Sequence, residues 1–207
     1  MNFSFAIPTD FSDVLRVDQI IQSIRSLKIP NYEILIISKY KRQPLYDTEF
    51  LFFDQNDADN KINLKKTILI DHCKHDNIVL FHDYFIFDQD WYTNYLSFGE
   101  DWDVCSNPQL LITGKRHFTD WVVWDSPIYP RWASLDYDDW THTKYMYQSG
   151  GYMLVKKQFI RSCPLNPSMV WGSAEDVEWS LRMRNIARWK CNSKSIVRHN
   201  KIHRDAL

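Results

Sequence analysis

The segment NIVLFHDYFIFDQDWY, residues 77–92, decides the fold that the sequence predicts. Residues 78–81 form an uninterrupted apolar run, which is typical of a strand buried on both faces of a sheet. His82 and Asp83 follow where that strand is expected to end. Because ligands of open α/β sheets bind beyond the carboxyl ends of the strands, Asp83 could hold a divalent cation that contacts a phosphate. Asp83 could also simply cap a turn, and its position alone leaves both interpretations open.

The same strand pattern recurs before this segment and alternates with helices. Apolar runs predict strands at residues 3–7, 32–37 and 50–53. Apolar residues at helical spacing predict one helix over residues 14–27, followed by Pro30, and a second helix around residues 64–69. This alternation with short connections predicts an α/β fold whose central sheet is mixed but mostly parallel and is flanked by helices.

Polar side chains follow four of the predicted strands at the ends where ligands bind. They are Thr9, Ser38, Asp54 and Asp83, and we expect them to meet at one edge of the sheet. The first strand–helix turn contains no glycine, so the dinucleotide-binding fingerprint is absent, and the sequence contains no P-loop. A nucleotide that binds here must therefore be held without a glycine-rich loop.

The composition argues against several classes of partner. The 207 residues carry a formal net charge of −1, which gives no basic footprint for nucleic acid or an anionic membrane surface. Four widely spaced cysteines without a CxxC pair argue against a zinc knuckle or a disulfide framework and fit a reducing compartment. No apolar run reaches membrane-spanning length, and the first strand begins near Met1 without a basic leader. We therefore expect a soluble cytoplasmic protein, or a domain of a longer one.

Residues 101–148 are irregular and rich in aromatic side chains, with aspartates between them. The whole chain contains nine Trp, eleven Tyr and twelve Phe, more than a core requires. These rings can form a small satellite core, or they can line an acceptor cleft in which rings stack on sugar faces and carboxylates accept hydrogen bonds from hydroxyls. The two interpretations are compatible with each other.

Regular structure is predicted again from Gly150 and Gly151, which lead into a strand that reaches residue 155. Glycines at such a position allow a ligand or another segment to approach the backbone closely. The pair is therefore a candidate for the edge of a binding site.

The C-terminal part of the chain predicts a helix and a short strand. The segment at residues 171–176 opens the helix, which extends to about residue 187, with Glu175 and Asp176 in its first turn and Val177 and Leu181 on its inner face. Its acidic first turn also suits the helix dipole without any further function. Residues 195–199 predict a short edge strand that delivers His199, and His203 follows four residues later. A lone histidine is usually structural, so His199 counts only together with other site residues.

Taken in chain order, these landmarks resemble those of the GT-A fold glycosyltransferases, particularly inverting enzymes of the family-2 type. They are strand-Pro-Thr-Asp, strand-Ser, strand-His-Asp, Gly-Gly-strand, Trp-Gly-x-x-Glu-Asp-helix and a late His. The Trp-Gly…Glu-Asp element is also similar to that of the β-1,4-galactosyltransferases. The resemblance spans residues 3–203 and extends to the N-terminal glycosyltransferase domain of a large chlorella-virus protein, which would place the chain in the host cytoplasm. It implies one domain over residues 1–207, with a nucleotide-sugar-binding half at 1–100 and an acceptor-binding, catalytic half at 101–207.

The resemblance implies roles for individual residues. Asp83 would match the last aspartate of the family's Asp-x-Asp motif, which binds the metal, and His199 would complete the metal site. Phe81 takes the place of the motif's first aspartate, so Asp83 is the motif's only carboxylate here. Asp176 would be the general base, and Glu175 would orient the acceptor.

The resemblance also implies two sets of binding residues. The nucleotide-sugar donor would contact Pro8, Thr9, Asp10, Ser38, Asp54, Lys61, Lys65 and Asp83, with Lys61 or Lys65 at the diphosphate. The acceptor would contact Trp121, Trp124, Gly150, Gly151 and Trp171. Because family members typically carry Asp where Ser38 stands, the base stays open between a UDP-sugar, which is favoured, and a GDP-sugar.

The implied activity is metal-dependent transfer of a sugar, with inversion, to a glycan or another hydroxyl acceptor. Oxygen ligands with one imidazole favour Mn²⁺, with Mg²⁺ as the alternative cofactor. The implied partners include no nucleic acid, and no membrane span is implied.

Two alternative functions remain. A sugar-phosphate nucleotidyltransferase uses a related sheet, but its glycine-rich basic loop after the first strand is absent. A non-catalytic carbohydrate-binding domain stays open because the first aspartate of the motif is missing.

Overall fold

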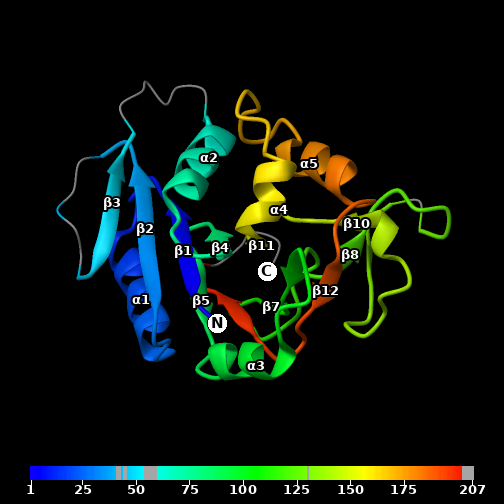
Figure 1. Ribbon diagram of the computed structural model, residues 1–207, viewed down its shortest axis with the longest axis horizontal. Coiled ribbons are helices and arrows are strands. Elements are labelled where there is room, and N and C mark those ends of the chain that lie inside the picture. The colour runs from blue at the N-terminus through cyan, green and yellow to red at the C-terminus, as the bar shows by residue number, and fades with distance from the viewer. Residues whose placement is uncertain (41–42, 44–45, 54–59, 130, 202–207) are drawn as a thin grey trace.

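The computed structural model describes residues 1–40, 43, 46–53, 60–129 and 131–201, and its centre is a seven-stranded sheet (Figure 1). The strands of this sheet are β1 (Phe3–Pro8), β2 (Tyr32–Ser38), β3 (Thr48–Phe52), β4 (Asn77–Phe81), β6 (Val104–Ser106), β11 (Tyr152–Lys156) and β12 (Trp189–Cys191). They lie in the order β12-β6-β11-β4-β1-β2-β3. The strands predicted from apolar runs are thus confirmed as β1 to β4 and β11, with small shifts at their ends.

Strand β11 runs against its neighbours. It pairs antiparallel with β4 and β6, whereas β1 pairs parallel with β2 and β4, and β2 with β3. Tyr152, the first residue of β11, lies opposite Phe81, the last residue of β4. Because β11 is reversed, Gly150 and Gly151 lie at the carboxyl end of β4. The reversal brings a late segment of the chain to the sheet edge where the sequence predicts a ligand site.

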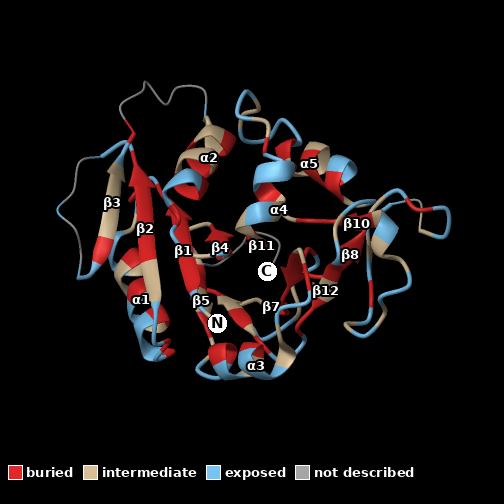
Figure 2. Ribbon diagram, viewed as in Figure 1, coloured by how far each residue is buried: buried red, intermediate tan, exposed pale blue. Residues whose placement is uncertain are grey.

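Helices cover both faces of the sheet, and each face has its own hydrophobic cluster (Figure 1). One face carries α1 (Val14–Ser26) and α3 (Trp91–Phe98). The other face carries α2 (Ile62–His72), α4 (Lys157–Ser162) and α5 (Glu175–Met183). Figure 2 shows that the central strands are mostly buried, whereas the helices carry both buried and exposed residues. Among the described residues, no helix has both the length and the apolar character needed to cross a membrane.

Helix α1 forms for the reasons that the sequence indicates. The side chain of Asp13 caps its N-terminus by accepting a hydrogen bond from the amide of Arg16 at 3.0 Å. Its fully buried residues are spaced three and four apart and are Val17, Ile20, Ile21 and Ile24. This apolar stripe fixes α1 on the sheet and thereby positions the turn that connects it to the carboxyl end of β1.

Helix α5 begins at Glu175, within the predicted opening segment at residues 171–176, but it ends at Met183, short of residue 187. Trp179 and Met183 are buried, whereas Leu181 is 41% exposed, so the predicted inner position of Leu181 is wrong. The indole Nε1 of Trp179 donates a hydrogen bond to the carbonyl of Cys163 at 2.7 Å. The large, hydrogen-bonded ring of Trp179 is buried in preference to the smaller side chain of Leu181. The face of α5 that carries Trp179 therefore turns toward the core.

Two small three-stranded sheets complete the described fold. One has the order β10-β8-β9, with β10 (Met146–Tyr147), β8 (Val122–Val123) and β9 (Ala133–Ser134), and the 3₁₀ turn η2 (Thr143–Tyr145) precedes β10. The other has the order β5-β13-β7, with β5 (Phe85–Phe87), β13 (Val197–His199) and β7 (Gln109–Leu110). The strand predicted around His199 therefore exists, but its predicted place at an edge is wrong because β13 pairs on both sides.

Candidate functional site

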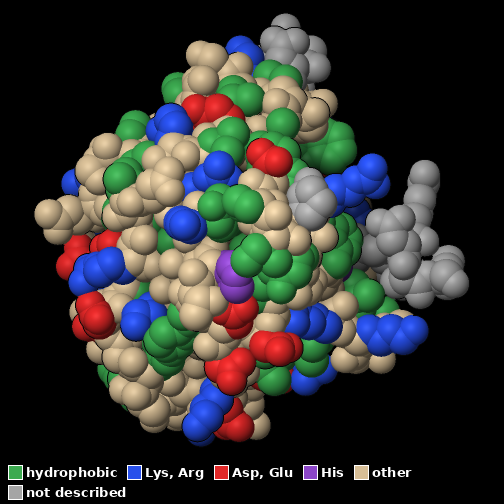
Figure 3. Space-filling view, turned by 90° about the vertical axis from the view of Figure 1, so that its right-hand side faces the viewer, with side chains coloured by type: hydrophobic (Ala, Val, Ile, Leu, Met, Phe, Trp, Pro, Cys, Tyr) green, Lys and Arg blue, Asp and Glu red, His purple; other side chains and the backbone are tan. Residues whose placement is uncertain are grey.

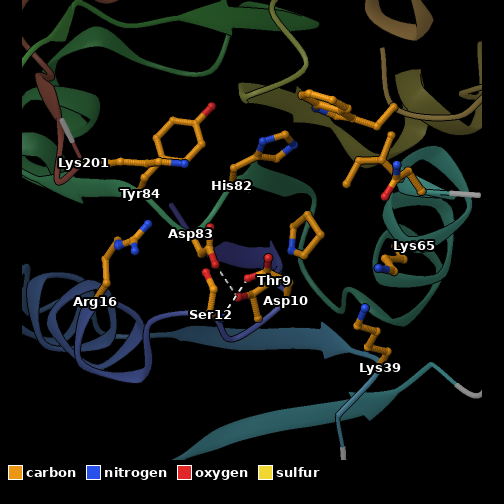
Figure 4. Close-up of a pocket in the computed structure, with 14 residues that line it drawn as sticks. Thr9, Asp10, Ser12, Arg16, Lys39, Lys65, His82, Asp83, Tyr84 and Lys201 are labelled. Atoms are coloured by element: carbon orange, nitrogen blue, oxygen red, sulfur yellow. Dashed lines mark hydrogen bonds between the residues drawn. The ribbon is translucent and has the colours of Figure 1, made fainter. Parts of the chain in front are cut away.

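A cleft of about 520 Å³ opens at the carboxyl ends of β1 and β4 (Figure 4). Its volume lies within the range of small-molecule sites. The residues that line it come from the ends of strands β1, β2 and β4, from the turn into α1 and its first turn, from the start of α2, and from the segments before α5 and after β13. They are Pro8, Thr9, Asp10, Ser12, Arg16, Lys39, Asn60, Ile62, Lys65, His82, Asp83, Tyr84, Trp171 and Lys201.

Thr9 and Asp83 face each other across the ends of β1 and β4 (Figure 4). Thr9 Oγ1 donates a hydrogen bond to Asp83 Oδ2 and accepts one from the amide of Phe11 at 2.9 Å. The amide of Thr9 donates to the carbonyl of Ile37 at 3.0 Å, which ties the turn to β2. Burial raises the pKa of Asp83, although the hydrogen bond from Thr9 opposes this shift. The pair presents one oriented carboxylate to the cleft.

Basic side chains surround the Thr9–Asp83 pair. Arg16 lies on α1, Lys39 follows β2, Lys65 lies on α2 and Lys201 follows β13. Figure 4 shows these four side chains distributed around the centre of the cleft. Arg16 is paired with Asp13 at 2.9 Å, but the described lining still holds more basic groups than carboxylates, so the cleft has an excess of positive charge. This excess suits an anionic ligand such as a diphosphate.

His82 lies at the inner wall of the cleft. Its amide donates a hydrogen bond to the carbonyl of Gly151 at 2.9 Å, and its Nε2 is buried with no hydrogen-bond partner among the described residues. Burial lowers the pKa of His82 to about 3, and the positive charges of Lys66 and Lys201 act in the same direction. The imidazole is therefore neutral near pH 7, and it can take part in a hydrogen bond to a ligand without carrying charge.

Gly150 and Gly151 connect the cleft to the start of α5. A Cβ atom on Gly151 would lie 2.7 Å from the hydroxyl oxygen of Tyr84, which lines the cleft. A Cβ atom on Gly150 would lie 3.2 Å from Asp176 Cβ and 3.2 Å from Lys66 Nζ. Side chains thus approach both glycines closely, which is the situation that glycines before a strand permit. The cleft and Asp176 lie on the two sides of this glycine pair.

Hydrogen bonds hold the carboxylate of Asp176 in one orientation. Oδ2 accepts from the amide of Gly150 at 3.0 Å and from the hydroxyl of Tyr147, and Oδ1 accepts from the amide of Val177 at 2.9 Å. Burial raises the pKa of Tyr147, and the charges of Asp176 and Glu175 raise it further. The phenol therefore keeps its proton and remains a donor. A carboxylate fixed beside a cleft is the geometry that a general base requires.

Lys66 is a buried cation beside this carboxylate. Its side chain is 1% exposed, and Nζ donates a hydrogen bond to the carbonyl of Gly150 at 2.7 Å. Burial lowers the pKa of Lys66 to about 8, while the charges of Glu175 and Asp176 oppose the shift. Glu175 is also buried, so water screens the acidic start of α5 poorly. Lys66 supplies the opposite charge that Glu175 and Asp176 need there.

A divalent metal would have to be held jointly by the protein and a bound ligand. Among the described residues, no group of three or more His, Cys, Asp and Glu side chains is placed to hold a metal ion. Asp83 offers a carboxylate in the cleft, and Mg²⁺-like ions are commonly held by one or two carboxylates together with phosphate oxygens. His199 is buried, and its ring centroid lies 4.5 Å from the ring centroids of Phe85 and of His117. The residues present fit a metal whose ligands come partly from the protein and partly from a bound diphosphate.

Most residues predicted to bind the donor line the cleft, namely Pro8, Thr9, Asp10, Lys65 and Asp83. Ser38 is instead fully buried, and its hydroxyl accepts a hydrogen bond from the amide of Tyr40 at 3.2 Å. Lys61 lines a separate hollow together with Leu64 and Pro167. Asp54 and His203 lie outside the described residues.

The residues predicted to bind the acceptor are more scattered. Trp171 is 63% exposed and lines the cleft, where its amide donates a hydrogen bond to the carbonyl of Asn60 at 2.9 Å. Trp124 is half-buried directly after β8, and its amide donates a hydrogen bond to the carbonyl of Tyr145 at 3.0 Å. Trp121 is fully buried, and its Nε1 donates to the carbonyl of Asp139 at 3.1 Å. A fully buried ring cannot stack on a sugar, so Trp121 belongs to the core and not to an acceptor surface.

Sequence reasoning missed several cleft residues. Lys39 and Tyr84 directly follow Ser38 and Asp83, so the rule that selected those strand-end residues could also have selected their neighbours. Arg16 carried a weaker signal, its position three residues after the helix cap Asp13. Lys201 carried none, because it reaches the cleft only through the pairing of β13 with β5.

Comparison of the sequence with protein-family models and with curated proteins gives no match. The fold, in contrast, is similar to solved structures. TarS 1–349 of S. aureus superposes with a TM-score of 0.70 at 10% identity, over 96% of this chain and 60% of TarS 1–349. The same protein in complex with UDP-GlcNAc gives a TM-score of 0.70 at 10% identity, over 98% of this chain and 60% of the other.

A second solved protein with this fold is GalNAc-T7 with UDP, GalNAc and Mn²⁺. It superposes with a TM-score of 0.69 at 13% identity, over 96% of this chain and 43% of GalNAc-T7. This chain thus spans 60% or less of the length of these neighbours. At such identities the likeness concerns the fold, and the chain has the mixed, mostly parallel α/β sheet of the GT-A glycosyltransferases.

Proposed function

We propose that this chain is a glycosyltransferase that moves a sugar from a nucleoside-diphosphate sugar to a hydroxyl of a glycan acceptor. The observation that carries the proposal is that a cationic cleft and the fixed carboxylate of Asp176 lie on the two sides of Gly150 and Gly151. Further support comes from the neighbours of the same fold, since TarS binds UDP and UDP-GlcNAc and GalNAc-T7 binds UDP. A UDP-sugar is the favoured donor, and a GDP-sugar is the alternative.

In this proposal the two parts of the chain have different tasks. Residues 1–100 supply most of the donor site through the ends of β1, β2 and β4. Residues 101–207 bind the acceptor, supply the base and add Lys201 and His199 to the donor side. The topology supports this division because the first part contributes Thr9 and Asp83, whereas the second contributes Gly150 and Asp176. The proposed site therefore forms only when β11 has paired with β4.

On the donor side, the bond from the anomeric carbon to the phosphate oxygen has to break. Negative charge then accumulates on the leaving nucleoside diphosphate, and Arg16, Lys39, Lys65 and Lys201 stabilise it electrostatically. A bound Mn²⁺ or Mg²⁺ would supply Lewis-acid stabilisation of the same charge. Asp83, oriented by Thr9, and His199 are its proposed protein ligands.

On the acceptor side, a hydroxyl becomes a good nucleophile when its proton is removed. The acceptor oxygen forms a bond to the anomeric carbon, and its proton passes to the carboxylate of Asp176. The bond to the phosphate oxygen breaks, and its electron pair leaves with the nucleoside diphosphate. Attack from the face opposite the leaving group inverts the anomeric centre. Tyr147 and the amide of Gly150 hold Asp176 in position, and Glu175 orients the acceptor.

The test measures nucleoside diphosphate release from UDP-glucose, UDP-galactose, UDP-GlcNAc and GDP-mannose, with and without Mn²⁺ and with and without sugar acceptors. We expect slow hydrolysis of one donor alone and faster release with an acceptor, and NMR of the product then gives the anomeric configuration. Thermal stabilisation by a donor without any release would favour the non-catalytic carbohydrate-binding alternative. If no donor stabilises the protein and none releases a nucleoside diphosphate, the proposal is contradicted.

Asp176→Asn is the sharpest variant for this mechanism. It keeps the size of the side chain but removes the proton acceptor, so we expect transfer to fall by about 10²-fold or more while donor affinity changes little. Glu178→Gln is a matched control, since it removes another carboxylate from the first turn of α5 that is paired with Arg182 at 2.5 Å. Equal losses of transfer and donor binding in Asp176→Asn would rule out the role of Asp176 as base.

A further inference from the structure

An exposed row of aromatic rings leads from the surface to Asp176. The ring centroids of Phe118 and Trp132 lie 6.4 Å apart, and those of Trp132 and Tyr147 lie 4.3 Å apart, both pairs close to perpendicular. The hydroxyl of Tyr147 donates its hydrogen bond to Asp176. Phe118 is 55% exposed and Trp132 is 44% exposed, whereas Tyr147 is buried. We call Phe118, Trp132 and Tyr147 the aromatic row.

Trp132 differs from the neighbouring tryptophans of its region in combining an exposed ring with the absence of a covering cation among the described residues. Trp121 of the same region is fully buried. Trp140 is 41% exposed, but Lys190 Nζ lies 4.2 Å from its ring centroid, and its Nε1 donates to the carbonyl of Tyr137 at 3.1 Å. Within the described part of the chain, no cation covers Trp132 in this way. An exposed indole face that leads to a fixed carboxylate is a surface suited to a ligand with an apolar face.

Charge on this side of the molecule does not favour a strongly charged ligand. Figure 3 views the side that carries the sheet β10-β8-β9 and the end of α5, and it shows acidic and basic side chains interspersed with hydrophobic ones. A pyranose ring fits such a surface because it is uncharged, has an apolar C–H face that stacks on aromatic rings, and has hydroxyls around its rim. A carboxylate at the end of the row can accept a hydrogen bond from one of those hydroxyls.

We propose that the aromatic row is the acceptor subsite and binds a pyranose of the acceptor against Trp132, with one hydroxyl directed to Asp176. The inference rests on the proposed function for the role of Asp176. Phe118 lies one ring farther from the carboxylate, so it contacts the next sugar of a longer glycan. The acceptor class is therefore a glycan, with its terminal sugar on Trp132 and its preceding sugar on Phe118.

The first test measures binding and needs no turnover. Methyl α- and β-pyranosides of glucose, galactose, mannose, fucose and rhamnose are mixed with the protein, UDP and Mn²⁺, and saturation is transferred from the aromatic protons of the protein to the sugars by NMR. We expect transfer to the ring C–H protons of at least one glycoside. This signal should fall about fivefold or more in Trp132→Ala, survive in part in Trp132→Phe, and persist in the matched control Trp140→Ala.

The outcomes separate this inference from the proposed function. Equal signals in Trp132→Ala and Trp140→Ala, or no signal from any glycoside with the unmodified protein, would overturn the aromatic row as a sugar site. Failure to release a nucleoside diphosphate from any donor would instead contradict the glycosyltransferase proposal. If transfer occurs, the KM for the glycoside acceptor should rise about tenfold in Trp132→Ala relative to Trp140→Ala, with the same donor KM in both. A fall in kcat without a change in acceptor KM would overturn the subsite.

Discussion

Asp83 is oriented before any ligand arrives. Thr9 donates to one of its oxygens, and the amide of Thr9 is itself bonded to β2, so the position of the carboxylate is set by three adjacent segments. A preorganised ligand loses less freedom when a cation binds. In the proposed metal site, this preorganisation would offset in part the lack of a second carboxylate, since Phe81 stands two residues before Asp83 and is fully buried in the sheet.

Asp83→Asn should weaken the Mn²⁺-dependent part of donor binding. The amide still accepts the hydrogen bond from Thr9 but no longer carries the negative charge that holds a cation. We expect the affinity for the nucleoside diphosphate in Mn²⁺ to fall by at least about tenfold, and the affinity in the presence of a chelator to change little. Isothermal titration calorimetry with and without Mn²⁺ measures both values.

Asp10→Asn is the control, because Asp10 is an exposed carboxylate in the same cleft. It should preserve the response of donor affinity to Mn²⁺. If Asp83→Asn and Asp10→Asn respond to Mn²⁺ in the same way, the metal is not held by Asp83.

Substitution of Gly150 and of Gly151 should affect different kinetic constants. Alanine at 150 would bring a methyl group to 3.2 Å from Asp176 Cβ and Lys66 Nζ, so Gly150→Ala should displace the base. Alanine at 151 would press on the hydroxyl of Tyr84 at the rim of the cleft, so Gly151→Ala should disturb the donor. We expect kcat of transfer to fall about tenfold or more in Gly150→Ala with little change in donor KM. Gly151→Ala should mainly raise the donor KM. Steady-state kinetics distinguish the two, and the opposite assignment of effects would contradict this description of the site.

At the scale of elements, the turn before α5 is strained. Ala174 has φ 61° and ψ 39°, a left-handed conformation that costs a residue with a Cβ about 1 kcal/mol or more. This turn sets where Glu175 and Asp176 begin the helix. The strain is therefore located at the point that positions the proposed base.

Ala174→Gly should not have the destabilising effect that glycine has inside a helix. It relieves the strain but adds freedom to the unfolded chain, so we expect the free energy of unfolding to stay constant or to rise by up to about 1 kcal/mol. Ala174→Val, with a branched Cβ in the same conformation, should lower it by about 1–2 kcal/mol. Urea denaturation of both variants provides the measurement. A clear loss of stability in Ala174→Gly would show that the turn is not strained.

The elements that could be predicted from sequence are those whose burial is uniform. Strands β1, β2 and β4 are buried at nearly every position, and an uninterrupted apolar run shows this directly. Strands β5 to β10 contain two or three residues each, too few to establish a period. Helix α3 was missed because it is a short aromatic segment without a side-chain cap. The direction of β11 depends on its pairing with β4 and is not encoded in its own residues.

The site was predictable where it follows strand ends. Thr9 and Asp83 were found because each comes directly after a buried run, and the parallel pairing of β1 with β4 brings them together. Tyr147 and Trp132 could not be found in this way. Their places depend on short strands and ring packing in a region with no regular pattern, and the same region buries Trp121. Exposure, which separates Trp132 from Trp121, is a property of the folded chain.

At the scale of the whole molecule, Lys66 should make stability depend on pH. Its pKa falls from 10.5 to about 8 on folding, so between these pH values the unfolded chain binds a proton that the folded chain has lost. Stability therefore rises with pH across this window. At pH 7 Lys66 is protonated in both the folded and the unfolded state. The whole cost of burying its charge then lowers the free energy of unfolding. Between pH 8 and 10.5, the free energy of unfolding of the unmodified protein should therefore rise by about 3 kcal/mol relative to that of Lys66→Met.

Denaturation of the unmodified protein and of Lys66→Met at several pH values tests this dependence. Other groups titrate in the same range, and the difference between the two proteins removes their contribution. Lys115→Met, which removes an exposed lysine, controls for the loss of one positive charge. Parallel pH profiles for the unmodified protein and Lys66→Met would contradict the buried, deprotonating lysine.

The pairing of β6 with β11 has a consequence for how acceptor specificity can diversify. These strands are neighbours in the central sheet, so the chain leaves the sheet after Ser106 and re-enters beside the same point at Tyr152. The described part of the intervening segment carries Trp132 and Tyr147 but no strand of the central sheet. Its two ends lie side by side, and a graft of another length therefore closes at a small entropic cost. Under the proposed function, segments with different acceptor surfaces can therefore replace one another while the strands that carry the donor cleft stay unchanged.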